Sequence, residues 1–127
     1  MSELIKQRPK FLNLAEIKQP VPAVASILHR ISGVGLFLML PLLIWLLDLS
    51  LKSADSYQTL LAVTAYPLVK LILIGLLWAF MHHFCMGIRI LLIDIHVGVE
   101  KAQARASAKA VLVISLLLTL ILGVKLC

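Results

Sequence analysis

Three stretches of the chain contain no Asp, Glu, Lys or Arg and are mostly apolar: residues 31–47, 71–88 and 110–124. A helix needs about 20 residues, each rising about 1.5 Å, to cross the apolar layer of a membrane. Each stretch therefore needs a few flanking residues to span it. The pattern predicts helices near residues 24–50, 67–92 and 106–126. Pro67 suits the first turn of the second helix, where its missing N–H is not needed.

The overall composition points the same way. Of 127 residues, 61% are hydrophobic and 14% are charged, whereas soluble domains average about a quarter charged residues. A soluble enzyme is therefore excluded. We predict an all-α integral membrane bundle of three transmembrane helices, with an N-terminal segment 1–23 ahead of an anchor domain 24–127. Residues 1–20 contain no apolar region typical of a secretory signal, so the first helix is expected to direct insertion, and Cys85 and Cys127 are expected to be unpaired thiols.

The positive charges predict an orientation. The sequence has a net charge of +6 and 12 basic residues. Basic residues accumulate on the cytoplasmic side of membrane proteins, so the surplus reports topology rather than nucleic-acid binding. The pattern predicts a cytoplasmic N-terminus and second loop and a periplasmic C-terminus. The cytoplasmic basic residues would be Lys6, Arg8, Lys10, Lys18, Arg30, Arg89, Lys101, Arg105 and Lys109, and the opposite ones Lys52, Lys70 and Lys125.

A first group of polar residues lies where the first helix enters the membrane. Ser26, His29, Arg30 and Gly33 are spaced at i, i+3, i+4 and i+7, which places them on one helical face. Polar groups within a span are costly and usually mark a site. A basic collar in the phospholipid headgroups is the simpler interpretation, but a collar does not require a shared face.

A second group lies inside the second helix. His83 belongs to a column of small residues at steps of four, Gly75, Ala79 and Gly87. Small residues let two helices approach closely, with histidine as an interhelical hydrogen-bonding group. The same bare surface suits a flat macrocycle, and imidazole is a common axial ligand of haem iron. Spacing alone leaves both interpretations open. His82 points about 100° away from His83, together with Met86.

Two further residues extend this group toward the cytoplasmic end. Arg89 and Arg30 are expected at a similar depth, because the first helix enters where the second leaves. Two guanidinium groups there suit anionic propionates or a carbonyl. Asp94 is a candidate proton relay at the water boundary, although an ordinary solvated charge is the better explanation on placement alone.

Together these motifs resemble the cytochrome b556 subunits of succinate dehydrogenase, the larger of two membrane anchors of respiratory complex II. The resemblance runs through essentially the whole chain. It is carried by Arg8-Pro9, Asn13-Leu14, Pro22, the segment 26–33, His83-x-x-x-Gly87-Ile88-Arg89 and Asp94.

The resemblance implies a function in the bacterial inner membrane. His83 would ligate haem b, one per complex, with the second axial ligand supplied by the smaller anchor subunit. Ser26 and Arg30 would line the ubiquinone pocket, and His29 and Arg30 would lie near the haem propionates, with Arg89 at the same level. The implied partners are the second anchor, an iron–sulfur subunit and a flavoprotein subunit, which pass electrons from succinate to ubiquinone.

One position departs from the family. Many members have a histidine directly after the Gly-Ile-Arg motif, where this chain has Ile90, so a propionate contact is absent or is supplied by His82. Two alternatives remain at this point: a structural or assembly membrane protein without a redox role, and the anchor of a quinol:fumarate reductase. Anchors of the latter kind that hold two haems need more transmembrane histidines than this chain has.

Overall fold

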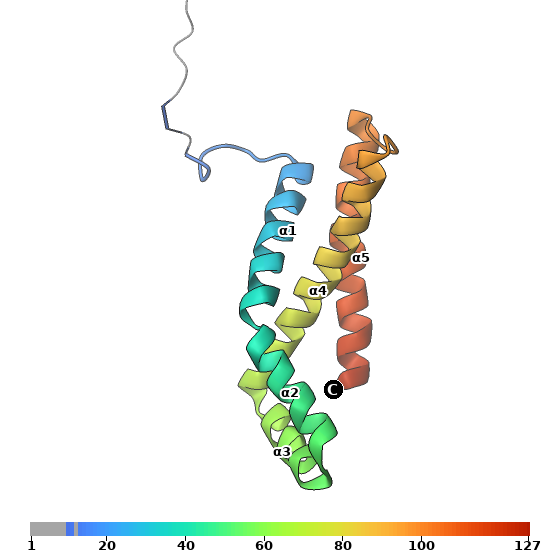
Figure 1. Ribbon diagram of the computed structural model, residues 1–127. Helices are drawn as coiled ribbons and strands as arrows, with labels where there is room; N and C mark the ends of the chain where they lie inside the picture. Colours follow the sequence, from blue (N-terminus) through green and yellow to red (C-terminus); the bar gives the residue numbers. More distant parts are fainter. Residues whose placement is uncertain (1–9, 12) are drawn as a thin grey trace, which may run out of the picture.

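The computed structural model describes residues 10–11 and 13–127. The regular secondary structure of these residues consists of α-helices joined by loops (Figure 1). Three helices, α1, α4 and α5, are long and apolar enough to cross a membrane. The predicted all-α architecture with three spanning helices is therefore confirmed. The described helices are α1 (Val21–Leu38), α2 (Leu40–Lys52), α3 (Ala54–Ala65), α4 (Pro67–Asp94) and α5 (Lys101–Leu126).

The prediction of one continuous helix over residues 24–50 is wrong. The structure divides it at Met39, whose φ of −92° and ψ of 0° separate α1 from α2. The cause lies two residues later, because Pro41 has no N–H to give to the carbonyl of Phe37 and its ring crowds that carbonyl. The chain also enters α1 three residues earlier than predicted, directly after Pro20.

The first loop contains a helix that hydropathy did not reveal. Ser53 and Ser56 form a capping box at the start of α3: the backbone N–H of Ser56 donates to Ser53 Oγ at 3.1 Å, and the backbone N–H of Ser53 donates to Ser56 Oγ at 2.9 Å. These two bonds satisfy amides that the first helical turn leaves free. α2 and α3 thus form a helical hairpin at the end of the molecule away from the start of α1 (Figure 1).

The second predicted helix is close to the observed α4. Pro67 lies in its first turn as expected, and the helix continues to Asp94, two residues beyond the predicted end. The chain then reverses direction through His96, which adopts a left-handed φ of 63°. The amides of His96 and Val97 donate to the carbonyls of Ile93 and Leu92, both at 2.9 Å, which is the Schellman arrangement that ends many helices.

Replacing His96 by glycine is expected to stabilise this turn. Glycine adopts a positive φ without the steric cost that a Cβ brings, which is about 1 kcal/mol. The thermal midpoint of the purified complex should therefore rise by a few degrees. Gly98 provides the opposite control, since its φ of +72° makes Gly98→Ala a destabilising change. A lower midpoint for His96→Gly would show that the histidine side chain contributes more than its backbone costs.

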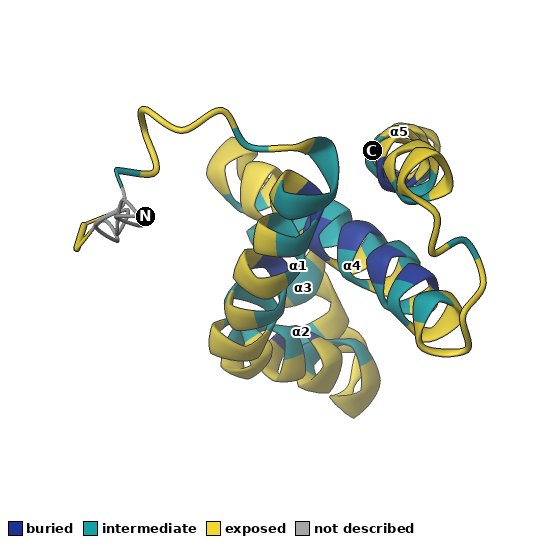
Figure 2. Cartoon of the chain, turned by 90° about the horizontal axis from the view of Figure 1, so that it is seen from above, coloured by how far each residue is buried: buried dark blue, intermediate teal, exposed yellow. Residues whose placement is uncertain are grey.

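α4 is the central helix of the bundle. It packs against α1 on one side and α5 on the other, and its buried residues face these neighbours (Figure 2). The core is small, formed by Ala25 of α1, Met86 of α4, and Ala108 and Val111 of α5. Most large apolar side chains instead lie on the outer surface, as expected for helices whose solvent is lipid.

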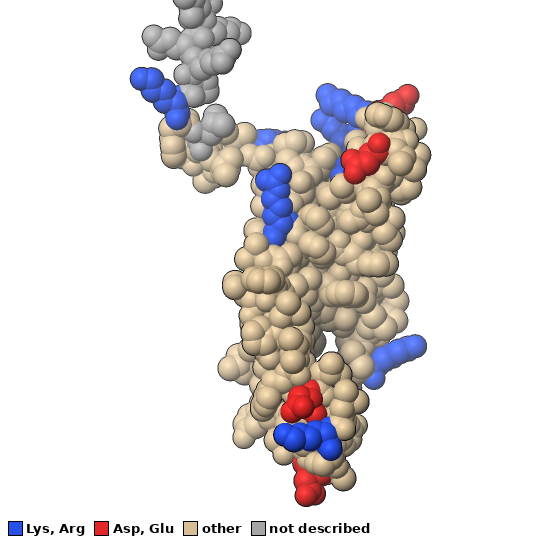
Figure 3. Space-filling model, viewed as in Figure 1, with Lys and Arg blue, Asp and Glu red and all other residues tan. Residues whose placement is uncertain are grey.

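Charged side chains gather at the two ends of the bundle, and the visible face between them is largely uncharged (Figure 3). The start of α1, the end of α4 and the start of α5 lie together at one end (Figure 1). Of the nine basic residues assigned to that side, Lys6 and Arg8 lie outside the described residues. Which of the two ends faces the cytoplasm stays a prediction.

Candidate functional site

His83 faces α1 and is held there through one ring nitrogen. Its Nδ1 lies 3.1 Å from the carbonyl oxygen of His29 and 3.3 Å from Ser32 Oγ. The Ser32 hydroxyl itself donates to the same carbonyl at 2.8 Å. Because a carbonyl oxygen only accepts, the proton of the neutral imidazole is placed on Nδ1 and points at these two oxygens.

The other nitrogen of His83 remains available. Nε2 has no hydrogen-bond partner within the described residues, and it is not fully buried. An imidazole that binds a metal usually donates its second N–H to a carbonyl or carboxylate, which fixes the tautomer and the ring orientation. The contacts of His83 therefore fit an axial ligand of haem iron, with Nδ1 anchored and Nε2 free.

Two neighbours on α1 determine how closely the His83 ring approaches. The ring of His29 stacks on it, with centroids 4.2 Å apart and planes inclined by 11°. Gly33 lies directly beside it: a Cβ at this position would be 2.9 Å from His83 Cε1. Such a contact is closer than real carbon atoms approach, so the absence of a side chain at Gly33 is what admits the imidazole.

Replacing Gly33 by alanine should accordingly displace the His83 ring. We expect the absorption band of a haem bound through His83 to shift or lose intensity, because the ring must rotate away from His29 and Ser32. Gly35→Ala is the matched control, since a Cβ at Gly35 meets nothing within 4 Å. Identical haem spectra for the two variants would contradict the geometry described for His83.

Ser26 and Arg30 lie beside the contact between α1 and α4 rather than within it. The residues of α1 that meet α4 include His29, Ser32 and Gly33, whereas Ser26 is half-buried and Arg30 is exposed. Successive helical residues are about 100° apart, so the face predicted for all four polar residues is divided between the α4 contact and its flank. The flank is open on this chain, with a hydroxyl and a guanidinium on successive turns.

Arg89 is directed toward α5. It is 8% exposed, and its Nε donates to Ser107 Oγ at 2.9 Å while one terminal nitrogen donates to the carbonyl of Ala104 at 3.0 Å. These bonds tie the end of α4 to the start of α5. The structure therefore does not bring Arg89 together with His83, and its predicted place beside haem propionates stays a prediction. Asp94, the predicted relay, is exposed as the last residue of α4.

His82 lies inside the bundle, with 0% of its surface exposed. Its Nε2 is 3.2 Å from the carbonyl oxygen of Ala25, so within this chain it is a core residue. The suggestion that His82 supplies the contact missing at Ile90 is not supported by this position, because neither of its ring nitrogens reaches the surface.

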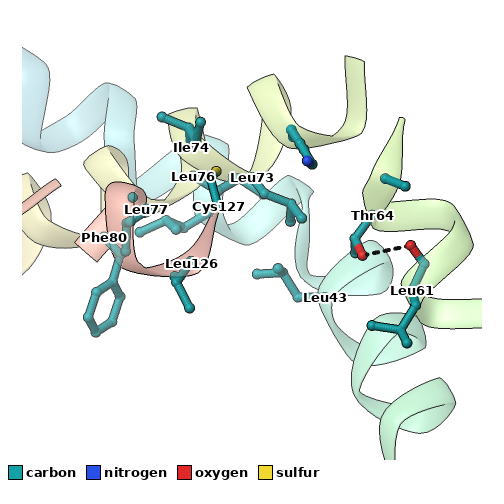
Figure 4. A pocket seen from close by; sticks show the side chains of 14 residues that line it. Leu43, Leu61, Thr64, Leu73, Ile74, Leu76, Leu77, Phe80, Leu126 and Cys127 are labelled. Carbon is teal, nitrogen blue, oxygen red and sulfur yellow. Dashed lines mark hydrogen bonds between the residues drawn. The ribbon is translucent and has the colours of Figure 1, made fainter. Parts of the chain in front are cut away.

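One cavity is remote from these residues. It has a volume of about 660 Å³ and lies where α2, α3 and α4 meet the end of α5, with Leu36 of α1 also in its lining. Figure 4 shows leucines of α2, α3, α4 and α5 around it, with the Thr64 hydroxyl hydrogen-bonded to the carbonyl of Leu61 within α3. Its lining is apolar except for Thr64, Lys70 and the Cys127 end. A second cavity of about 360 Å³ lies between α4 and α5 beside Arg89. Neither of these two cavities is lined by Ser26, Arg30 or His83.

Sequence reasoning missed two contributors to the site. Ser32 was noted only as part of a motif, although it follows His29 at i+3 and so shares its face. The backbone carbonyls of Ala25 and His29 were not considered, because a carbonyl inside a helix leaves no signal in the sequence. Both are visible only once α4 is placed against α1.

The chain is similar to known proteins along nearly its whole length. Residues 5–122 match the family described as succinate dehydrogenase/fumarate reductase transmembrane subunit. A succinate dehydrogenase cytochrome b556 subunit of Rickettsia typhi is 34% identical over 96% of this chain and 95% of its own length. The subunit of the same name from Coxiella burnetii is 35% identical, covering 93% and 95%, and that from Paracoccus denitrificans is 31% identical, covering 90% and 88%.

Proposed function

The chain belongs to the succinate dehydrogenase cytochrome b556 subunits of the succinate dehydrogenase/fumarate reductase transmembrane family, and from this premise we propose that it holds haem b and helps to form a ubiquinone-reduction site. The subunit anchors the complex in the membrane and does not contain the dehydrogenase centre. Electrons from succinate arrive through a flavoprotein and an iron–sulfur subunit. A second, smaller anchor completes both sites.

The observation that carries the haem assignment is the state of the two nitrogens of His83. Nδ1 is bonded to His29 O and Ser32 Oγ, which leaves the lone pair on Nε2 as the ligand. His29 and Arg30 lie on the adjacent part of α1 and supply polar groups for propionates. A haem held there would supply one-electron storage beside the quinone site, and the partner anchor would contribute the second ligand.

The quinone assignment depends on Ser26 and Arg30. A serine hydroxyl donates a hydrogen bond to a quinone oxygen, and a guanidinium stabilises the negative charge that develops there as electrons arrive. Such fixed donors stabilise a transition state without reorganisation. Asp94, at the water boundary, transfers protons toward this end of the bundle. The open flank of α1 is where the partner anchor and the iron–sulfur subunit enclose the pocket.

The orientation follows from the charges. In the sequence, nine of the 12 basic residues come before or within α1, or around the α4–α5 loop. The positive-inside preference places the end of the bundle with the start of α1 and this loop in the cytoplasm, and the C-terminus in the periplasm of a bacterial inner membrane. Ser26, Arg30 and His83 then lie in the cytoplasmic half, where a soluble iron–sulfur subunit docks.

Purification of the intact complex in mild detergent tests the proposal as a whole. We expect three partner subunits, a b-type band in the reduced-minus-oxidised spectrum, and bound ubiquinone after solvent extraction. Partners without a haem band would instead favour a purely structural anchor. Menaquinone in place of ubiquinone, with fumarate reduction as the faster reaction, would favour the quinol:fumarate reductase alternative.

A further inference from the structure

His82 is the most deeply buried polar side chain on α4, and the proposed function gives it no task. None of its surface is exposed. The ring of Trp78 stacks against it with centroids 5.4 Å apart. Met86, one turn further along α4, is 1% exposed and belongs to the same core as Ala25. An apolar side chain would fill such a place without any polar group to satisfy, so the presence of an imidazole requires an explanation.

The contact with α1 indicates the tautomer of neutral His82. Its Nε2 lies 3.2 Å from the carbonyl oxygen of Ala25, which accepts and does not donate, so Nε2 carries the proton. Nδ1 is then a buried acceptor without a partner in the described part of the chain. A buried acceptor left unpaired is unfavourable. The bond made by Nε2 is therefore the favourable polar contact of this ring, and Nδ1 contributes none.

The two adjacent histidines bond to α1 at two levels. His82 donates to the carbonyl of Ala25, and His83 donates to the carbonyl of His29. These carbonyls are four residues apart, about 6 Å along the helix axis. A single hydrogen bond would let α1 rotate about the contact, whereas two bonds on successive turns fix both its rotation and its height against α4.

Each of the two bonded carbonyls directly precedes a residue of the proposed quinone site. Ser26 directly follows Ala25, and Arg30 directly follows His29. Each residue of the proposed quinone pair is thus one peptide unit beyond a carbonyl that α4 holds. The bond from His83 serves the haem ligand as well, but the bond from His82 acts on α1 alone.

We propose that His82 is a positioning residue for the quinone site: its hydrogen bond to the Ala25 carbonyl fixes α1 against α4 and so places Ser26 and Arg30 relative to the haem ligand His83. This inference rests on the proposed function. A misplacement of about 1 Å in a reacting group costs about a hundredfold in rate, so a bond that prevents rotation of α1 has a measurable consequence for quinone reduction.

A pair of amide substitutions tests the role of the bond. The amide nitrogen of glutamine reaches the position of the imidazole Nε2, whereas that of asparagine reaches only the position of Nδ1. In the intact complex, His82→Gln should keep kcat/KM for ubiquinone within about twofold of the wild type. His82→Asn should lower it on the order of tenfold, about 1.4 kcal/mol. Succinate oxidation by a soluble acceptor should be unchanged in both variants.

Met86→Leu is the control for packing, since Met86 is equally buried in the same core and makes no bond to α1. It should leave kcat/KM for ubiquinone within about twofold. Equal values for His82→Gln and His82→Asn would overturn the proposal, as would a loss in Met86→Leu as large as that in His82→Asn. Because the buried asparagine amide lacks the bond that glutamine makes, the two variants also differ in stability, so the rates are compared on preparations with equal subunit and haem content.

The haem spectrum separates the two levels of the argument. The His82 variants should still contain haem at the wild-type amount, because the ligand His83 itself is unchanged. If the wild-type complex itself lacked the band or did not reduce ubiquinone, the proposed function would fail whatever the His82 variants did. A wild-type complex that shows both, with His82→Asn indistinguishable from it, refutes only the positioning role.

Discussion

Replacing His83 by alanine is expected to remove the b-type absorption band from the purified complex. Among the described residues, His83 is the only histidine whose Nδ1 is hydrogen-bonded while its Nε2 is left free. The variant loses this nitrogen. Even outer-shell contacts of metal ligands are worth about 10–100-fold in affinity, so loss of a ligand should lower haem content by more than about tenfold. Haem is quantified per complex by the reduced-minus-oxidised spectrum.

His96→Ala is the control for this experiment, since His96 is exposed in the α4–α5 loop and should keep the full band. Co-purification of the partner subunits and succinate oxidation by a soluble acceptor verify that the His83→Ala complex still assembles. An unchanged band in an assembled His83→Ala complex would exclude His83 as the ligand and favour its role as a contact between α1 and α4.

Replacing Arg30 by leucine should abolish ubiquinone reduction while succinate is still oxidised by an artificial soluble acceptor. Leucine keeps much of the apolar stem but removes the charge that we propose faces the developing negative charge on the quinone. Removal of one such preorganised donor costs about 100–1,000-fold in other enzymes, and a fall on the order of a hundredfold is expected here. The two rates are measured on the same preparation with the two acceptors.

Arg105→Leu is the matched control for Arg30→Leu. It removes one exposed positive charge from the same end of the bundle, and both rates should remain close to the wild type. Arg30→Lys should recover only part of the activity, because an ammonium group supplies the charge without the planar pair of donors. Quinone reduction that persists in Arg30→Leu would refute its place in the pocket.

The structure changes how the polar residues of α1 are understood. A spacing of i, i+3, i+4 and i+7 places residues on one broad face, but that face is wider than a helix contact. His29 and Gly33 meet His83, while Ser26 and Arg30 lie on the flank. The division follows from where α4 packs. The proposed haem and quinone sites thus draw on neighbouring surfaces of the same two turns of α1.

Arg89 and His82 illustrate the limit of spacing arguments more clearly. The sequence places His82 by its angle on α4 and Arg89 by its depth in the membrane, yet neither quantity says which helix covers the residue. α5 packs on the side of Arg89 and supplies Ser107 and the Ala104 carbonyl. α1 packs on the side of His82 and supplies the Ala25 carbonyl. The partners of both side chains come from long-range contacts.

The amino-acid sequence by itself determined that this protein is a helical membrane anchor with three spans, and its motifs identified His83, Ser26 and Arg30 as the residues to examine. Hydropathy carries this information because lipid imposes a length and an uncharged composition on every span. Only the tertiary structure decided where the first span breaks and which nitrogen of His83 is left free. It alone showed that two adjacent histidines hold successive turns of α1. In a chain whose outer surface is as apolar as its core, periodicity does not distinguish the face toward a neighbour from the face toward lipid, so those contacts appear only when the helices are packed.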